Sequence, residues 1–155
     1  MKLSKIFASV SAIAISLGIT VGAASAEKVL TVASWAAPFH TMNENVFPWM
    51  NSQLKSCTGG SVSLKVEYGM APPPAMYDTV RDGVADMSWI VYGYTPGKFV
   101  TTMIAELPSI PGNARQKSVA FQKTYEKFLE SAGEAKGVQV LANYTHGPGM
   151  ANTTK

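Results

Sequence analysis

The sequence contains 155 residues, of which 46% are hydrophobic and 15% are charged, and its formal net charge is +3. A chain this apolar and this weakly charged can bury enough surface to offset its ordering entropy, which argues against intrinsic disorder. Cys57 is the single cysteine, so a disulfide scaffold within the chain is excluded. The basic residues do not cluster, so nucleic acid is not indicated as a partner. The length of the chain allows one domain.

The beginning of the sequence has the pattern of a secretory signal peptide. Two lysines precede an apolar run over residues 6–21, and three small residues follow the run. The run is about 16 residues long, whereas a helix needs roughly 20 to cross a bilayer, so a cleaved signal is favoured over a membrane anchor. We expect cleavage after Ala26 and export to the periplasm. Residues 1–26 are thus assigned to the signal peptide and residues 27–155 to the exported chain.

Four segments have the composition of β-strands. Residues 28–35 are rich in apolar and β-branched side chains, and residues 61–68 alternate apolar with polar side chains. Residues 86–92 are apolar on both faces in their second half, which is typical of the centre of a covered sheet. Residues 138–144 are predicted to form the fourth strand.

Helices are predicted between these strands. Thr41 and Glu44 match a capping box, so a helix should begin there. It should kink or restart at Pro48, because proline removes a backbone donor. Further short helices are predicted to begin at Pro74 and to cover residues 99–107.

The longest predicted helix follows Asn113. This residue is a favourable N-cap with Gln116 three residues later, and apolar residues then recur at helical spacing as far as Ala132. Gly133 should end the helix. Strands that alternate with helices in this way predict an α/β fold with a mostly parallel sheet flanked by helices.

The candidate ligand-binding residues lie where the predicted strands end, because ligands of open parallel sheets bind beyond the carboxyl ends of the strands. The candidates are Trp35, His40, Tyr92, Tyr94 and His146. Their rings would supply flat apolar walls, and their hydroxyl and imidazole groups would bind a carboxylate or a hydroxyl. The alternative is a structural role, since Trp89 and Tyr92 on a strand also suit the core and His40 can simply precede a helix.

Sequence signatures of common enzymes are absent. The sequence contains no G-x-S-x-G nucleophile turn, no H-E-x-x-H zinc motif and no glycine-rich phosphate loop. His40, Glu44 and His146 are residue types that bind metals, but capping already accounts for Glu44, so neither a metal nor another cofactor is predicted. We therefore predict no catalytic residues and no enzymatic activity, and an exported periplasmic hydrolase is the alternative.

Several motifs together carry a family resemblance. They are the first strand ending in Trp35 with Pro38 and His40 after it, the sequence YDTVRDGVADM at 77–87, the sequence GYTPGKF at 93–99, and ELP at 106–108. With the signal peptide, they are similar to the solute-binding subunit of tripartite ATP-independent periplasmic (TRAP) transporters. The similarity covers all of residues 27–155.

The resemblance implies the first lobe of a two-lobed periplasmic binding protein of type II. Such a receptor would capture a small organic acid, such as a C4-dicarboxylate, and deliver it to membrane permease subunits driven by an ion gradient. A ligand-sensing module is the alternative. Lys98 stands where related chains carry an arginine, and it keeps the charge without the planar fork.

The resemblance also sets an expectation about length. The family's carboxylate-binding arginine would lie downstream of the loop that contains His146, and two lobes of typical size need about 300 residues. We therefore expect an N-terminal fragment in which residues 27–155 form an incomplete first lobe and the second lobe is missing.

Overall fold

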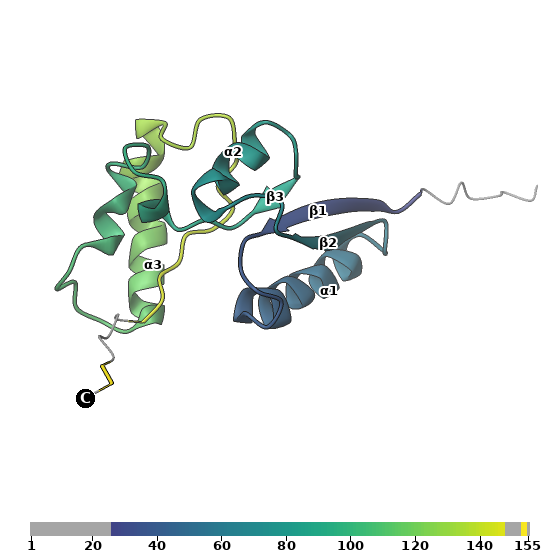
Figure 1. Cartoon of the computed structure of the whole chain (residues 1–155), viewed down its shortest axis with the longest axis horizontal. Coiled ribbons are helices and arrows are strands. Elements are labelled where there is room, and N and C mark those ends of the chain that lie inside the picture. Colours follow the sequence, from purple (N-terminus) through teal and green to yellow (C-terminus); the bar gives the residue numbers. More distant parts are fainter. Residues whose placement is uncertain (1–25, 148–152, 155) are drawn as a thin grey trace, which may run out of the picture.

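The computed structural model of the chain describes residues 26–147 and 153–154 (Figure 1). The predicted signal peptide, apart from Ala26, lies outside the described residues. Within the described part, no helix is both long enough and apolar enough to cross a membrane.

In the described residues, a three-stranded parallel sheet forms the base of the fold. β1 (Lys28–Ser34) lies between β2 (Val62–Tyr68) and β3 (Met87–Ser88). β1 pairs with β2 along its full length and with β3 at Val32 and Ala33. The parallel sheet confirms the predicted fold class, and the first two strands match their predicted ranges to within one residue.

The third and fourth predicted strands differ from the structure. β3 is two residues long, because the chain leaves the sheet and enters a 3-10 helix at Tyr92–Tyr94. The strand predicted at 138–144 is wrong, since this segment has no regular secondary structure. Its composition favours a strand where a neighbouring edge is available to pair with. Here the backbone amide of Asn143 donates instead to the side chain of Gln122.

Helices cover both faces of the sheet (Figure 1). A π-helical turn at Met42–Val46 leads into α1 (Phe47–Cys57), and a 3-10 turn at Pro73–Ala75 leads into α2 (Met76–Arg81). The restart of the first helix beside Pro48 confirms the prediction, because a proline in the first turn removes an amide that has no partner within the helix.

Neighbouring residues of β1 show which helix covers which face. The side chain of Ser34 bonds Asn43, which precedes α1, whereas Ala33 packs with Met76 of α2 and with Ala85. Successive residues of a strand point to opposite faces, so α1 and α2 lie on opposite sides of the sheet.

The first helix is capped by His40 and not by Thr41. Thr41 already has helical backbone angles, φ −49° and ψ −36°, and its side chain makes no capping bond. The His40 carbonyl accepts from the amides of Asn43 and Glu44 at 2.8 and 3.0 Å, and His40 Nδ1 accepts from the Met42 amide at 3.2 Å. The predicted capping box is therefore wrong, because a capping residue needs extended backbone to turn its side chain back onto the helix.

α3 (Ala114–Thr124) begins at the N-cap that the sequence predicted, and this cap is a capping box. The Asn113 side chain accepts from the Gln116 amide at 3.0 Å, and the Gln116 side chain accepts from the Asn113 amide at 3.1 Å. Gly133, with a positive φ of 68°, follows the last helical turn. The turns between α3 and this glycine are a π-helix at Tyr125–Leu129 and a 3-10 helix at Glu130–Ala132.

Aromatic side chains join α3 to the rest of the fold. Phe99 is 1% exposed, and the rings of Tyr77 in α2 and Tyr92 meet it edge-on with centroids 5.4 and 4.9 Å away. Tyr92 also packs against Phe121 of α3, at 6.0 Å. Large rings in edge-to-face contact bury much apolar surface, so the rings around Phe99 hold α3 against the segment that follows β3.

A partly buried carboxylate fixes the next segment, where the predicted short helix is a 3-10 helix at Thr102–Glu106. Glu134 accepts from the amides of Thr101 and Thr102 at 2.7 and 3.0 Å and from the Thr102 hydroxyl at 2.6 Å. Burial disfavours the charged form of Glu134, but the hydrogen bonds outweigh it and lower the pKa to about 2 from the ordinary 4.5. The carboxylate is therefore ionised in the folded protein at neutral pH.

Replacing Glu134 with Gln should lower the free energy of unfolding by about 1–2 kcal/mol at pH 7, because hydrogen bonds to a charged acceptor are stronger than those to an amide. The pKa of Glu134 is lowered in the folded state, so its contribution is present above about pH 4.5 and is lost as the pH falls through about 2. The difference between the two proteins should therefore shrink over this range.

Urea denaturation at a series of pH values measures the difference. Glu130→Gln is the control, because Glu130 is exposed. Equal destabilisation by both variants, or a difference that does not change with pH, would contradict the role given to Glu134.

Candidate ligand-binding site

Four aromatic side chains gather at the carboxyl end of β1. Trp35 stacks on Trp89 with ring centroids 4.3 Å apart, and His40 stacks on Trp89 at 5.0 Å, each with 28° between the planes. Tyr94 meets the Trp35 ring edge-on at 5.7 Å. These four residues are called the aromatic cluster below.

The sheet topology brings the cluster together. Trp35 follows β1 directly, and His40 caps the helix after it. Trp89 and Tyr94 come from the segment after β3. Because β1 and β3 are parallel neighbours, they end at the same edge of the sheet, and the residues that follow them meet there.

Both indole groups of the cluster are already hydrogen-bonded within the protein. Trp35 Nε1 donates to the Trp89 carbonyl at 3.2 Å, and Trp89 Nε1 donates to Ser34 Oγ at 3.0 Å. An indole nitrogen carries one hydrogen and accepts none. Neither tryptophan therefore has a further polar hydrogen to offer a ligand, and any contact with one would be through apolar ring surface.

Polar contacts to a ligand would come from the other two residues. His40 Nδ1 accepts from the Met42 amide, so the neutral imidazole carries its hydrogen on Nε2. The His40 side chain is exposed, and Tyr94, with its phenolic hydroxyl, is 45% exposed. An imidazole N–H and a phenol O–H are suitable donors for a carboxylate or a hydroxyl.

Lys98 contacts aromatic rings outside the aromatic cluster. The ammonium of Lys98 lies 4.0 Å from the centre of the Tyr77 ring and 5.8 Å from that of Phe99, within the range of a cation–π contact. Among residues 26–147 and 153–154, no three His, Cys, Asp or Glu side chains are grouped so that they could hold a metal ion.

The structure brings together three of the five predicted residues and adds Trp89. Tyr92 is separate, because its ring packs against Phe99 and Phe121 and its hydroxyl donates to Asn143. Burial raises the pKa of Tyr92 well above its ordinary value. The ligand-binding role of Tyr92 stays a prediction.

His146 also lies outside the aromatic cluster. Its side chain is exposed, and Nδ1 donates to the carbonyl of Gly147 at 2.5 Å. Its ligand-binding role likewise stays a prediction. Trp89 is not among the five predicted residues, because its segment is predicted to be a strand on which it suits the core, whereas β3 ends at Ser88.

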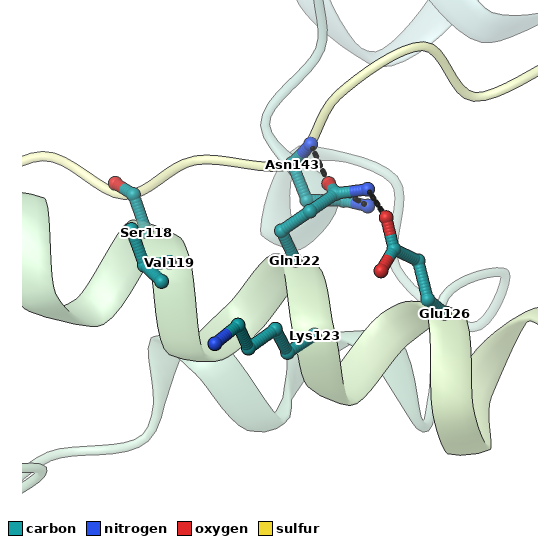
Figure 2. A pocket seen from close by; sticks show the side chains of 6 residues that line it. All are labelled: Ser118, Val119, Gln122, Lys123, Glu126 and Asn143. Atoms are coloured by element: carbon teal, nitrogen blue, oxygen red, sulfur yellow. Dashed lines mark hydrogen bonds between the residues drawn. The ribbon is translucent and has the colours of Figure 1, made fainter.

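A shallow hollow of about 370 Å³ lies beside α3, where Figure 2 shows Gln122 between Asn143 and Glu126. Gln122 Oε1 accepts from the backbone amide of Asn143 at 2.6 Å, and Gln122 Nε2 donates to Glu126 at 2.8 Å. These polar groups bind one another and fasten the segment around Asn143 to the helix. The aromatic cluster therefore remains the candidate site.

A parallel sheet with helices on both faces matches part of one lobe of a periplasmic binding protein, and comparison with solved structures agrees. A TRAP periplasmic solute-binding protein from Bordetella bronchiseptica, solved with (R)- and (S)-mandelate, is 37% identical at a TM-score of 0.72. A marine metagenome TRAP protein specific for aromatic acid ligands, solved with 3-hydroxybenzoate, is 34% identical at a TM-score of 0.72. One from Rhodoferax ferrireducens, with copurified benzoate, is 29% identical at 0.70.

These matches cover most of this chain and a smaller part of each relative. They span 77%, 80% and 77% of this chain but 38%, 39% and 38% of the three solved chains. The outer membrane transporter protein TsaT of Comamonas testosteroni is 32% identical over 123 residues, which is 78% of this chain and 36% of that protein. No protein-family model matches the chain. The predicted resemblance to TRAP solute-binding proteins is confirmed, and the chain spans less than two fifths of their length.

The difference in exposure between the three indoles can be tested by fluorescence quenching. The sequence has three tryptophans, and Trp49 on α1 is 63% exposed, whereas Trp35 and Trp89 are partly buried. Trp49→Phe should therefore lower the acrylamide quenching constant of the total emission, because the accessible indole is removed. Trp35→Phe, which leaves Trp49 in place, should raise it. An unchanged quenching constant in Trp49→Phe would contradict this arrangement.

Proposed function

We propose that this chain forms the first lobe of a periplasmic receptor of a TRAP transporter that captures an aromatic monocarboxylic acid. The observation that carries the proposal is the aromatic cluster at the shared edge of β1 and β3. Trp35 and Trp89 provide ring faces, while His40 Nε2 and the Tyr94 hydroxyl donate hydrogen bonds to the carboxylate of the ligand.

The chemistry of the cluster favours an aromatic acid over a C4-dicarboxylate. A benzene ring gains from offset or edge contacts with the indoles, whereas a dicarboxylate has no ring to stack. A dicarboxylate also brings two charges that need cationic or multiple polar partners when they are desolvated. Of the four cluster residues, His40 alone has a side chain that can become positively charged.

The similar proteins support this ligand class. The solved relatives carry mandelate, 3-hydroxybenzoate and benzoate, each of which has one aromatic ring and one carboxylate. They are TRAP solute-binding proteins, in keeping with a proposed function that contains no catalytic step. We assign residues 1–26 to export and residues 27–155 to the lobe, which would hand its ligand to the membrane permease.

Isothermal titration of the purified chain with benzoate, (R)-mandelate and succinate tests the proposal. The two aromatic acids should bind saturably, with dissociation constants on the order of 1 mM. The affinity should be weak because a single lobe buries only part of the ligand surface. Succinate should bind at least tenfold more weakly.

Tyr94→Phe tests the proposed polar contact to the carboxylate. It should weaken benzoate binding by about three- to tenfold, since one net hydrogen bond is worth about 1 kcal/mol. Trp49→Phe is the control, because Trp49 is an exposed aromatic residue on α1 and should leave the affinity unchanged. Equal binding of succinate and benzoate, or an equal effect of the two variants, would contradict the proposal.

A further inference from the structure

A chain of buried polar groups connects to the aromatic cluster at its base. Ser34 is 0% exposed and Asn43 is 5% exposed. Ser34 Oγ donates to Asn43 Oδ1 at 2.8 Å and accepts from Trp89 Nε1 at 3.0 Å. Asn43 Nδ2 donates to the carbonyls of Ala36 and Ala37, at 3.1 and 2.8 Å. Both side chains thus use donor and acceptor atoms within the protein.

The hydrogen bonds of Ser34 and Asn43 fix different parts of the aromatic cluster. The bond from Trp89 Nε1 to Ser34 sets the rotation of the indole about its side-chain torsions. The bonds from Asn43 hold the turn at Ala36 and Ala37, and the His40 amide donates to the Ala37 carbonyl at 2.9 Å. The buried pair of Ser34 and Asn43 therefore constrains both Trp89 and His40, whose rings stack on each other.

Burial restricts the side-chain conformations of Ser34 and Asn43. A buried donor that loses its partner suffers the full cost of its desolvation, so the alternative rotamers of Ser34 and Asn43 are penalised. Polar networks with every group paired specify one arrangement of the side chains around them. Apolar residues at the two positions could fill the same space, but they would leave the angle between the rings to packing alone.

We infer that Ser34 and Asn43 are positioning residues for the aromatic cluster, which set the orientation of Trp89 and His40 and thereby the fit of a planar aromatic ligand. Neither residue would contact the ligand, because Ser34 is 0% and Asn43 5% exposed. The ligand part of the inference rests on the proposed function, whereas the orientation of the rings can be measured without any ligand.

The orientation is read from the circular dichroism of the stacked indoles, since two indoles in contact give an exciton couplet whose size depends on the angle between them. In the full chain, Ser34→Ala should reduce the couplet of Trp35 and Trp89 by half or more and weaken benzoate binding three- to tenfold. Ser63→Ala is the matched control, because Ser63 is a buried serine, 5% exposed, on the neighbouring strand β2. It should leave both the couplet and the affinity unchanged.

A second variant keeps the test decisive if Ser34→Ala does not fold. Asn43→Asp preserves the shape of the side chain and an acceptor for Ser34 Oγ, but it turns a carboxylate oxygen toward the carbonyls of Ala36 and Ala37. It should therefore displace the turn that directly follows Trp35 and reduce the couplet by moving that ring. An unchanged couplet in a folded Ser34→Ala or Asn43→Asp protein overturns the inference, as does an equal loss in Ser63→Ala.

The two proposals fail in different ways. If the original chain shows the couplet, Ser34→Ala loses it, and benzoate binds neither protein, the ring-positioning role stands and the proposed ligand class falls. If benzoate binds the original chain and Ser34→Ala equally well, the link from the buried pair to the ligand is overturned while the proposed function stands.

Discussion

Parallel pairing through β1 is the constraint on which the candidate site depends. β1 hydrogen-bonds β2 along its length and β3 near its end, so the segments after β1 and β3 leave the sheet at one edge. Antiparallel pairing would send these segments to opposite edges, and residues more than fifty positions apart in the sequence would not stack. The contact between Trp35 and Trp89 is therefore a product of strand direction as much as of side-chain chemistry.

Features set by neighbours in the sequence were predictable. β1 and β2 follow from their apolar and alternating composition, and the start of α3 follows from the reciprocal pairing of Asn113 and Gln116. The segment at 138–144 has an equally suitable composition, but a strand also needs an edge to pair with, which composition does not show. The helix is capped by His40 and not by the predicted Thr41, because backbone angles, and not residue type, decide which side chain can bond the first amides of the helix.

The candidate site was predictable to the extent that it follows the strands. Trp35, His40 and Tyr94 were identified because each follows a strand end. Trp89 was missed because the predicted third strand ran past it, whereas β3 ends at Ser88. Nothing local marks the bond between Ser34 and Asn43, since it joins a strand to a helix start and becomes visible once the chain has folded.

The internal hydrogen bonds of the two indoles have a consequence for how such a receptor could diversify. With both N–H groups bound to protein atoms, the tryptophans of the proposed receptor would contribute recognition that is common to all aromatic rings. Under the proposed function, discrimination among ring substituents would then depend on the exposed members of the cluster, His40 and Tyr94. Substitutions at these two positions could change the preferred compound without disturbing the stacked indoles or the sheet that supports them, so one scaffold could serve a series of related aromatic acids.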